Sequence, residues 1–188
     1  MPMPVTMRET ELPGILEIEI EVFRDERGFF TETYNQQTWE ERGFSETFLQ
    51  DSMSLSTKGT LRGMHYQLDP HGMGKLVRAV RGSIFDVAVD LRRGSPTFGK
   101  WVGRELSDSN GMALWIPSGF AHGFVALEDD TLVYYKCSAV HAPDAERSLS
   151  YRCPTVGVAW PIEPTVVSTK DGAAPSLEQA EYNFTYSA

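Results

Sequence analysis

A chain of 188 residues is long enough for one well-filled hydrophobic core, and no linker-like run divides it, so we expect a single domain over residues 1–188. The 26 acidic residues outnumber the 17 basic ones and give a net charge of -9. This charge argues against a general nucleic-acid surface, because phosphate binding needs clustered cations in excess. A small anionic ligand is still compatible with it, since a few local arginines suffice.

The apolar runs are all much shorter than a membrane span, and the first residues lack the apolar stretch of a signal peptide. We therefore expect no membrane association. The two cysteines, Cys137 and Cys153, are too few for a disulfide framework. A cytoplasmic location with free thiols is the expectation.

The first regular pattern is at residues 14–23, GILEIEIEVF, where Leu16, Ile18, Ile20 and Val22 alternate with glutamates. This alternation is typical of a half-exposed strand. If the strand lies at the edge of a sheet, it is a candidate for pairing with a second subunit.

A turn at 24–28 leads to a second predicted strand at 29–34, FFTETY. Residues 35–42 are expected to form a short helix that ends at Gly43. Extended structure resumes at 47–54.

The central stretch contains two strand-like runs, 75–80 (KLVRAV) and 83–91 (SIFDVAVDL), separated by a short turn around Gly82. Both runs alternate apolar and polar residues, which predicts an antiparallel hairpin.

Further strand-like runs follow, separated by turns rich in Gly, Asn and Asp, at 102–106, 113–117, 123–127 and 131–138. The segment after Pro143 is rich in proline and polar residues, so we expect mostly loop there. Many short strands at regular spacing favour an all-β jelly-roll barrel with short peripheral helices, open at one end to a ligand.

His65 is the first candidate for chemistry. It lies three residues after Arg62 and ten before Lys75, so a titratable base could be bracketed by two cations. An isolated histidine is more often a hydrogen-bonded structural residue, and this motif alone leaves both interpretations open.

Residues 111–122, with the pattern Gly-x5-Pro-x-Gly-x2-His, resemble the second half of the cupin metal motif. The first half needs two histidines one residue apart, but His65-Tyr66-Gln67 offers one imidazole. Three or four ligands are hard to assemble from the four histidines of the chain at their spacings. We therefore expect a cupin-type barrel that uses side chains alone, with no metal and no other cofactor.

Two further patterns are unspecific by themselves. Tyr134-Tyr135 lies in an apolar strand, where packing in the core or on the surface is enough to explain two tyrosines. Residues 168–175 are typical of a solvated turn.

Seven motifs taken together, in this order and at this spacing, resemble the dTDP-4-dehydrorhamnose 3,5-epimerase family. They are residues 23–32, 61–67, 75–78, 85–90, 94–99, 116–124 and 168–171. The resemblance covers most of the chain. It implies a metal-free enzyme of dTDP-rhamnose biosynthesis that works as a homodimer and inverts C3 and C5 of dTDP-4-keto-6-deoxyglucose through an enolate, giving dTDP-4-keto-L-rhamnose.

The resemblance also assigns roles. It implies that His65 is the base, Asp171 orients it, Lys75 stabilises the enolate and Tyr135 reprotonates from the other face. The chemistry of these groups fits, because imidazole titrates near neutral pH and an ammonium stabilises a developing oxyanion. The implied substrate-binding residues are Arg24, Phe29, Glu32, Gln50, Arg62, His122 and Lys170.

Three positions depart from the family pattern. Ser52 stands where asparagine is more usual, Met73 where glutamine is, and His141 where a second tyrosine is. Each change alters the available hydrogen bonds, so the balance between the two carbons can shift, with epimerisation at C3 or C5 alone as the extreme case. Neutral drift at the rim of the pocket is the alternative.

Two other classes remain open. A nucleotide-sugar isomerase or dehydratase on the same scaffold would share the keto-sugar pocket, and product analysis would separate it. A non-catalytic sugar-binding cupin would keep the barrel without the acid and base residues. The joint presence of His65, Lys75, Tyr135 and Asp171 argues against that class.

Overall fold

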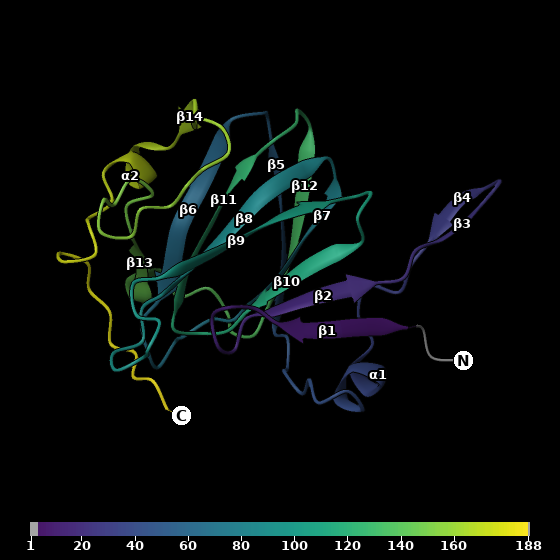
Figure 1. Ribbon diagram of the computed structural model, residues 1–188, viewed down its shortest axis with the longest axis horizontal. Helices are drawn as coiled ribbons and strands as arrows, with labels where there is room; N and C mark the ends of the chain where they lie inside the picture. Colours follow the sequence, from purple (N-terminus) through teal and green to yellow (C-terminus); the bar gives the residue numbers. More distant parts are fainter. Residues whose placement is uncertain (1–3, 188) are drawn as a thin grey trace.

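The computed structural model describes residues 4–187, and most of its regular structure is β-strand (Figure 1). Two sheets pack face to face. Sheet 1 contains, in spatial order, β1 (Val5–Glu9), β2 (Leu16–Ile20), β10 (Met112–Ile116), β7 (Lys75–Arg81), β12 (Thr131–Cys137) and β5 (Gln50–Ser56). Sheet 2 contains β13 (Glu146–Ser148), β6 (Thr60–Gln67), β11 (Phe120–Ala126), β8 (Ser83–Asp90) and β9 (Trp101–Ser107), and β14 (Val166–Val167) pairs with β6.

The path of the chain through these strands is that of a jelly roll. From β5 to β12 the chain crosses from one sheet to the other at nearly every step. The orders β5-β12-β7-β10 and β6-β11-β8-β9 form its two halves. The predicted fold class is confirmed, including the short peripheral helices α1 (Gln36–Glu40), η1 (Pro143–Ala145) and α2 (Thr169–Gly172).

The predicted hairpin of β7 and β8 is wrong. Both strands form, but β7 pairs with β10 and β12 while β8 pairs with β9 and β11. Gly82, at a φ of 71°, carries the chain from one sheet to the other. Val77 and Ile84 therefore enter the same core layer from opposite sheets. Alternation shows which face of a strand is buried, and it does not show which strand is its neighbour.

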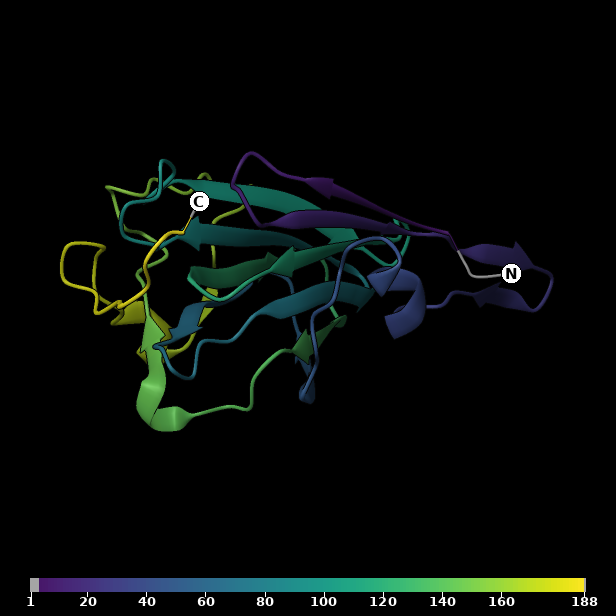
Figure 2. The ribbon, with the colours of Figure 1, turned by 90° about the horizontal axis from the view of Figure 1, so that it is seen from below.

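Apolar side chains are buried in three layers. The middle layer lies between the sheets and includes Val77, Leu114 and Phe124. The outer face of sheet 2 is covered by the C-terminal segment, through residues such as Leu149 and Phe184. The outer face of sheet 1 is covered in part by residues 34–48, which include α1. Figure 2 shows α1 lying close against the sheets.

The N-terminal region differs from expectation at two points. The strand β2 lies between β1 and β10, so it is not the edge of its sheet, and its predicted pairing with a second subunit is wrong. The expected strand at 29–34 is reduced to β4 (Gly28–Phe30), which pairs with β3 (Phe23–Asp25). This hairpin extends away from both sheets (Figures 1 and 2).

The expected short helix and the expected free thiols are both present. The helix predicted at 35–42 is α1, whose first turn is capped by Asn35 Oδ1 accepting from the Thr38 amide at 3.2 Å. Cys137 and Cys153 are both buried free thiols. Within residues 4–187, we find no helix with the length and apolar character that a membrane crossing requires.

Candidate active site

One end of the jelly roll encloses a cavity of about 580 Å³ between the two sheets. Sheet 1 contributes β5, β7 and β12 to its wall, sheet 2 contributes β6 and β11, and residues 166–171 close one side. The residues expected at the site that line this cavity are Gln50, Arg62, His65, Lys75, His122, Tyr135, Lys170 and Asp171. The three departures, Ser52, Met73 and His141, line it as well.

His65 and Asp171 form a close pair. His65 Nε2 lies 2.6 Å from Asp171 Oδ1, and the other carboxylate oxygen accepts from the Gly63 amide at 3.3 Å. Burial alone would raise the pKa of Asp171, but the hydrogen bond and charge of His65 and the Gly63 amide outweigh it and hold that pKa below its ordinary value. A carboxylate accepts only, so Nε2 of His65 donates and Nδ1 keeps a free lone pair.

Two glycines bring β6 and β11 together beside this pair. A Cβ on Gly63 would lie 2.5 Å from Gly123 Cα, and one on Gly123 would lie 2.8 Å from the Arg62 carbonyl oxygen. The ladder between the strands shifts register at this point, between His122 and Phe124. Glycine is therefore required at both positions to place His65 and His122 as close neighbours.

Lys75 begins β7 and projects into the cavity from sheet 1. Burial lowers the pKa of its ammonium, and the nearby Cys137, Asp86 and Glu146 offset this only in part. Among residues 4–187 no carboxylate lies within ion-pair distance of Lys75. Its charge is therefore available to a bound oxyanion.

Tyr135 projects into the cavity from β12, also in sheet 1. Its Oη lies 3.0 Å from Ser54 Oγ. Burial raises the pKa of this phenol well above its ordinary value, so it keeps its proton at neutral pH.

His122 forms a second pair, with Asp86. The His122 Nε2 lies 2.7 Å from Oδ1 of Asp86, whose side chain is fully buried. Burial lowers the pKa of His122 despite the neighbouring carboxylate, so the ring is neutral at pH 7. The ring of His122 also contacts Tyr135 edge-to-face, with centroids 6.3 Å apart.

The rim of the cavity is polar. Arg62 donates to Ser56 Oγ at 3.1 Å and to the Leu55 carbonyl at 3.0 Å. Lys170 Nζ lies 2.7 Å from Glu146 Oε2, which is also 3.6 Å from His141 Nε2. Gln50 accepts from the His141 amide at 2.9 Å.

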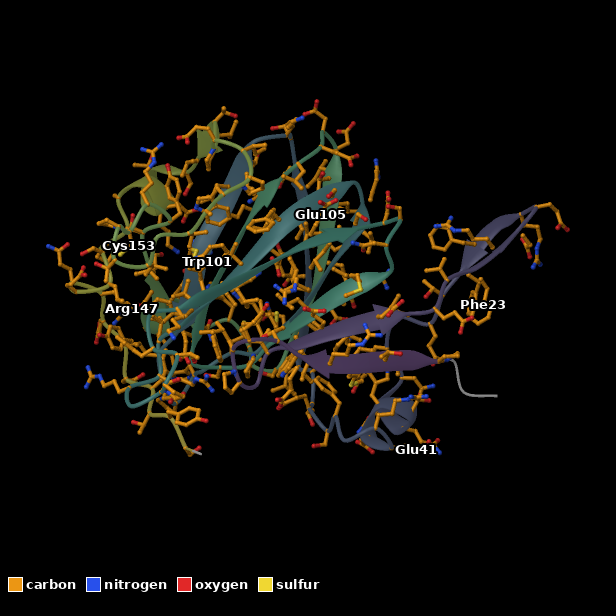
Figure 3. All side chains as sticks on the ribbon, in the orientation of Figure 1. Phe23, Glu41, Trp101, Glu105, Arg147 and Cys153 are labelled. Carbon is orange, nitrogen blue, oxygen red and sulfur yellow. The ribbon has the colours of Figure 1, made fainter. Side chains whose placement is uncertain are left out.

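Three of the expected substrate-binding residues lie elsewhere. Arg24 and Phe29 are on the exposed β3–β4 hairpin, with the Arg24 guanidinium 5.5 Å from the Phe29 ring centroid. Glu32 follows the hairpin and accepts from Asn35 at 3.1 Å. Figure 3 shows Phe23, on the same hairpin, apart from the side chains that fill the sandwich.

Sequence reasoning missed Asp86, Ser54 and Glu146 as parts of the site. Asp86 had a signal, because a carboxylate in the middle of an apolar strand needs a buried partner. Ser54 and Glu146 had none, since serine on a strand and glutamate before a loop are ordinary. Within residues 4–187, no three side chains among His, Cys, Asp and Glu are grouped as metal ligands would be.

The arrangement suits proton transfer next to a carbonyl group. A histidine with a free lone pair, an uncommitted ammonium and a protonated phenol face one cavity. These are a base, an oxyanion stabiliser and an acid.

Comparison with known proteins agrees with this chemistry. The family model of dTDP-4-dehydrorhamnose 3,5-epimerases matches residues 9–179. The chain is 48% identical over 175 residues to the dTDP-4-dehydrorhamnose 3,5-epimerase of Shigella flexneri, a match that covers 93% of this chain and 97% of the relative.

Two solved structures are similar over nearly the whole chain. The dTDP-6-deoxy-D-glucose-3,5-epimerase of Legionella pneumophila, in complex with dTDP-4-keto-L-rhamnose, superposes with a TM-score of 0.89 at 43% identity and 94% coverage of both chains. A 3'-monoepimerase of Streptomyces bikiniensis, in complex with dTDP-quinovose, gives a TM-score of 0.86 at 34% identity, with 92% and 88% coverage.

Proposed function

Because the chain belongs to the dTDP-4-dehydrorhamnose 3,5-epimerase family, we propose that it inverts C3 and C5 of dTDP-4-keto-6-deoxyglucose, giving dTDP-4-keto-L-rhamnose. One observation carries the proposal. The His65–Asp171 pair faces Lys75 and Tyr135 across a cavity between the sheets.

In the proposed mechanism His65 takes the first proton. A hydrogen on a carbon beside the C4 ketone is weakly acidic, and Nδ1 of His65 is free to accept it. The imidazolium that forms is stabilised by Asp171, which already binds Nε2 at 2.6 Å.

Lys75 stabilises the enolate oxygen that develops at C4. Its ammonium is partly desolvated and free of a carboxylate partner among the described residues, so its charge acts with little screening.

Tyr135 returns a proton from the opposite face, which inverts the carbon. The geometry supports this, because His65 comes from β6 of sheet 2 and Tyr135 from β12 of sheet 1, on opposite walls of the cavity. The Ser54 hydroxyl, 3.0 Å from the phenol oxygen, can donate to the tyrosinate left behind.

The cations at the rim are proposed to bind the nucleotide diphosphate. Arg62 and Lys170 both line the cavity, and guanidinium and ammonium groups pair well with phosphate oxygens. Neutral His122, held by Asp86, is proposed to accept a hydrogen bond from a sugar hydroxyl through Nδ1.

The protein is proposed to work as a homodimer, in the cytoplasm and as a single domain. Arg24 and Phe29 are expected at the nucleotide but lie on a hairpin outside their own cavity. A second subunit could present its hairpin to this cavity, with Phe29 stacking on the base and Glu32 nearby.

A second candidate function is epimerisation at one carbon only. It is favoured by Ser52, Met73 and His141, which depart from the family pattern and all line the cavity. The similar fold of a monoepimerase agrees with the same scaffold supporting that outcome.

Product analysis tests both candidates. The protein is incubated with dTDP-4-keto-6-deoxyglucose, and the sugar configuration is read by NMR. Inversion at C3 and C5 supports the main proposal and inversion at one carbon supports the second. Recovery of unchanged substrate, or of a dehydrated or isomerised sugar, would contradict both.

A further inference from the structure

The C-terminal residues 181–186 are anchored to the body of the protein on both sides of Asn183. Phe184 is 3% exposed and packs edge-to-face on Tyr66 of β6, with ring centroids 6.0 Å apart. Tyr66 Oη also donates to the Glu181 carbonyl oxygen at 2.7 Å, and the Arg93 amide donates to the Phe184 carbonyl oxygen at 3.0 Å. The backbone at Asn183 is therefore held in place.

The Asn183 side chain binds the backbone of Asp69 at two points. Its Oδ1 accepts from the Asp69 amide at 3.0 Å, and its Nδ2 donates to the Asp69 carbonyl oxygen at 2.9 Å. Within residues 4–187 the Asp69 backbone has no other hydrogen bond. Because one planar amide makes both bonds, it fixes the orientation of Asp69 as well as its position.

Asp69 belongs to the loop 68–74, which joins two strands of the site. The strand before the loop, β6, carries His65, and the strand after it, β7, begins at Lys75. Near its end the loop presents Met73, which lines the cavity and also a smaller adjoining cavity of about 80 Å³ that His65 and Lys75 line. Met73 therefore lies beside the proposed base and the proposed oxyanion stabiliser.

Lys75 is held by its sheet, whereas Met73 depends on the loop. Lys75 is in register with Ile116 of β10 and Cys137 of β12, so strands on both sides fix its backbone. Met73 belongs to no strand. A change at Asn183 should therefore move Met73 and leave Lys75 in place.

Three side chains hold the loop by hydrogen bonds. They are Asn183 at Asp69, Gln67 at the His71 carbonyl oxygen at 2.7 Å, and Ser138 at the Gly74 amide at 2.8 Å. Asn183 is the one of the three that comes from the C-terminal segment.

We propose that Asn183 is a positioning residue for this reaction and that it acts through Met73. By fixing Asp69 it sets where the loop places the Met73 thioether beside the sugar, and a small displacement there changes how each carbon is presented to the base. The inference rests on the proposed function, because that function gives the cavity a sugar with two reacting carbons. Asn183 lies beyond residues 9–179, the part of the chain that the family model matches, so the family model assigns it no role.

The ratio of the exchange rates at C3 and C5 tests the proposal. Deuterium incorporation from heavy water into dTDP-4-keto-6-deoxyglucose is followed by NMR for the unmodified protein, for Asn183→Ala and for the matched control Gln179→Ala, an exposed amide on the same segment. Asn183→Ala should change the ratio about 3-fold or more, and Gln179→Ala should leave it unchanged. Asn183 and Asp69 are both exposed, so the substitution leaves the core intact. Since both rates come from one sample, a loss of folded protein does not move the ratio.

A double-mutant cycle shows whether Asn183 acts through Met73. Met73→Ala should itself change the ratio, and adding Asn183→Ala should then change it no further, because the side chain that the loop positions is gone. An unchanged ratio in either single variant, or effects that multiply in the double variant, would overturn the proposal.

Amide hydrogen exchange, read by mass spectrometry, checks the first step without turnover. Peptides that cover residues 68–74 should exchange faster in Asn183→Ala but not in Gln179→Ala, since the Asp69 amide loses its acceptor. Unchanged exchange in Asn183→Ala would overturn the proposal. The unmodified protein separates the two claims. Deuterium at neither sugar carbon would contradict the proposed function, whereas incorporation at a ratio that Asn183→Ala leaves unchanged would contradict this inference alone.

Discussion

His65 and His122 are register partners on β6 and β11, and each ring binds an aspartate, yet their surroundings differ. The His65 side chain is 27% exposed at the cavity, whereas that of His122 is 6% exposed and its pKa is lowered by burial. His122 is therefore held neutral, and His65 is the ring that can take a proton from a substrate.

Asp171→Asn should lower kcat about 100-fold or more while KM changes little. The amide cannot stabilise the imidazolium of His65 as a carboxylate does, which weakens the base in the transition state. Steady-state kinetics measures this, with Asp144→Asn as an exposed control. An unchanged kcat in Asp171→Asn would show that the 2.6 Å contact between His65 and Asp171 has no role in catalysis.

Lys75 should set the alkaline limit of activity. Enolate stabilisation needs the ammonium, so on the alkaline side the rate falls as pH rises through the pKa of Lys75. Because burial lowers that pKa while burial raises the pKa of Tyr135, Lys75 loses its proton first, below its ordinary value of about 10.4. The pH profile of kcat should show this limb.

Lys75→Arg provides the check, since arginine stays charged across the whole range. The variant should keep part of the activity and lose the alkaline limb. A limb at the same pH in Lys75→Arg would assign it to another group.

Asp90→Asn should destabilise the fold by roughly 3 kcal/mol at neutral pH. Asp90 is fully buried and accepts from Arg92, Ser95 and Thr97 at 2.8, 2.6 and 2.7 Å. Burial raises its pKa, but these hydrogen bonds outweigh it and the pKa is lowered. The ionised form is thus favoured by folding, and its contribution is present above about pH 3.9, the unfolded value.

That contribution is lost as pH falls through the lowered folded pKa of Asp90. The free energies of unfolding in urea of the unmodified protein and of Asp90→Asn should therefore differ at pH 7, and this difference should narrow below about pH 3.9. Asp144→Asn is again the exposed control. A difference in free energy of unfolding that stays constant down to acid pH would contradict the stabilising role of ionised Asp90.

His141→Tyr should bring the exchange rates at C3 and C5 closer together. The backbone amide of His141 donates to Gln50 Oε1, which fixes the position of the residue. Because His141 lines the cavity, its side chain is placed to orient the sugar. Deuterium incorporation at each carbon, followed by NMR, measures the two rates. Equal rates in the unmodified protein that are unchanged in the variant would contradict a role for this departure.

The fold class was predictable because strand alternation and turn residues are local signals. The pairing of β7 was not, because a strand buried on one face fits several neighbours equally well. The position of β2 inside its sheet depends on β1, which residues 5–9 gave no clear signal to expect.

The site was predictable to the extent that its motifs are in the sequence. His65, Lys75, Tyr135 and Asp171 come together in one cavity as the resemblance implied. Asp86 and Ser54 were not found. Asp86 carried a signal as a carboxylate in an apolar strand, but the partners of both residues, His122 and Tyr135, lie on strands that are distant in sequence. The hairpin with Arg24 and Phe29 lies outside the cavity of its own chain, and one sequence cannot show which subunit a residue serves.

The most direct test is proton exchange in heavy water with dTDP-4-keto-6-deoxyglucose, using the unmodified protein and His65→Ala, with dTDP binding measured for both. The unmodified protein should incorporate deuterium at C3 and C5. His65→Ala should incorporate it at neither carbon while still binding dTDP, because the base is lost and the nucleotide contacts remain. Normal exchange by His65→Ala, or no exchange by an unmodified protein that binds the substrate, would contradict the account.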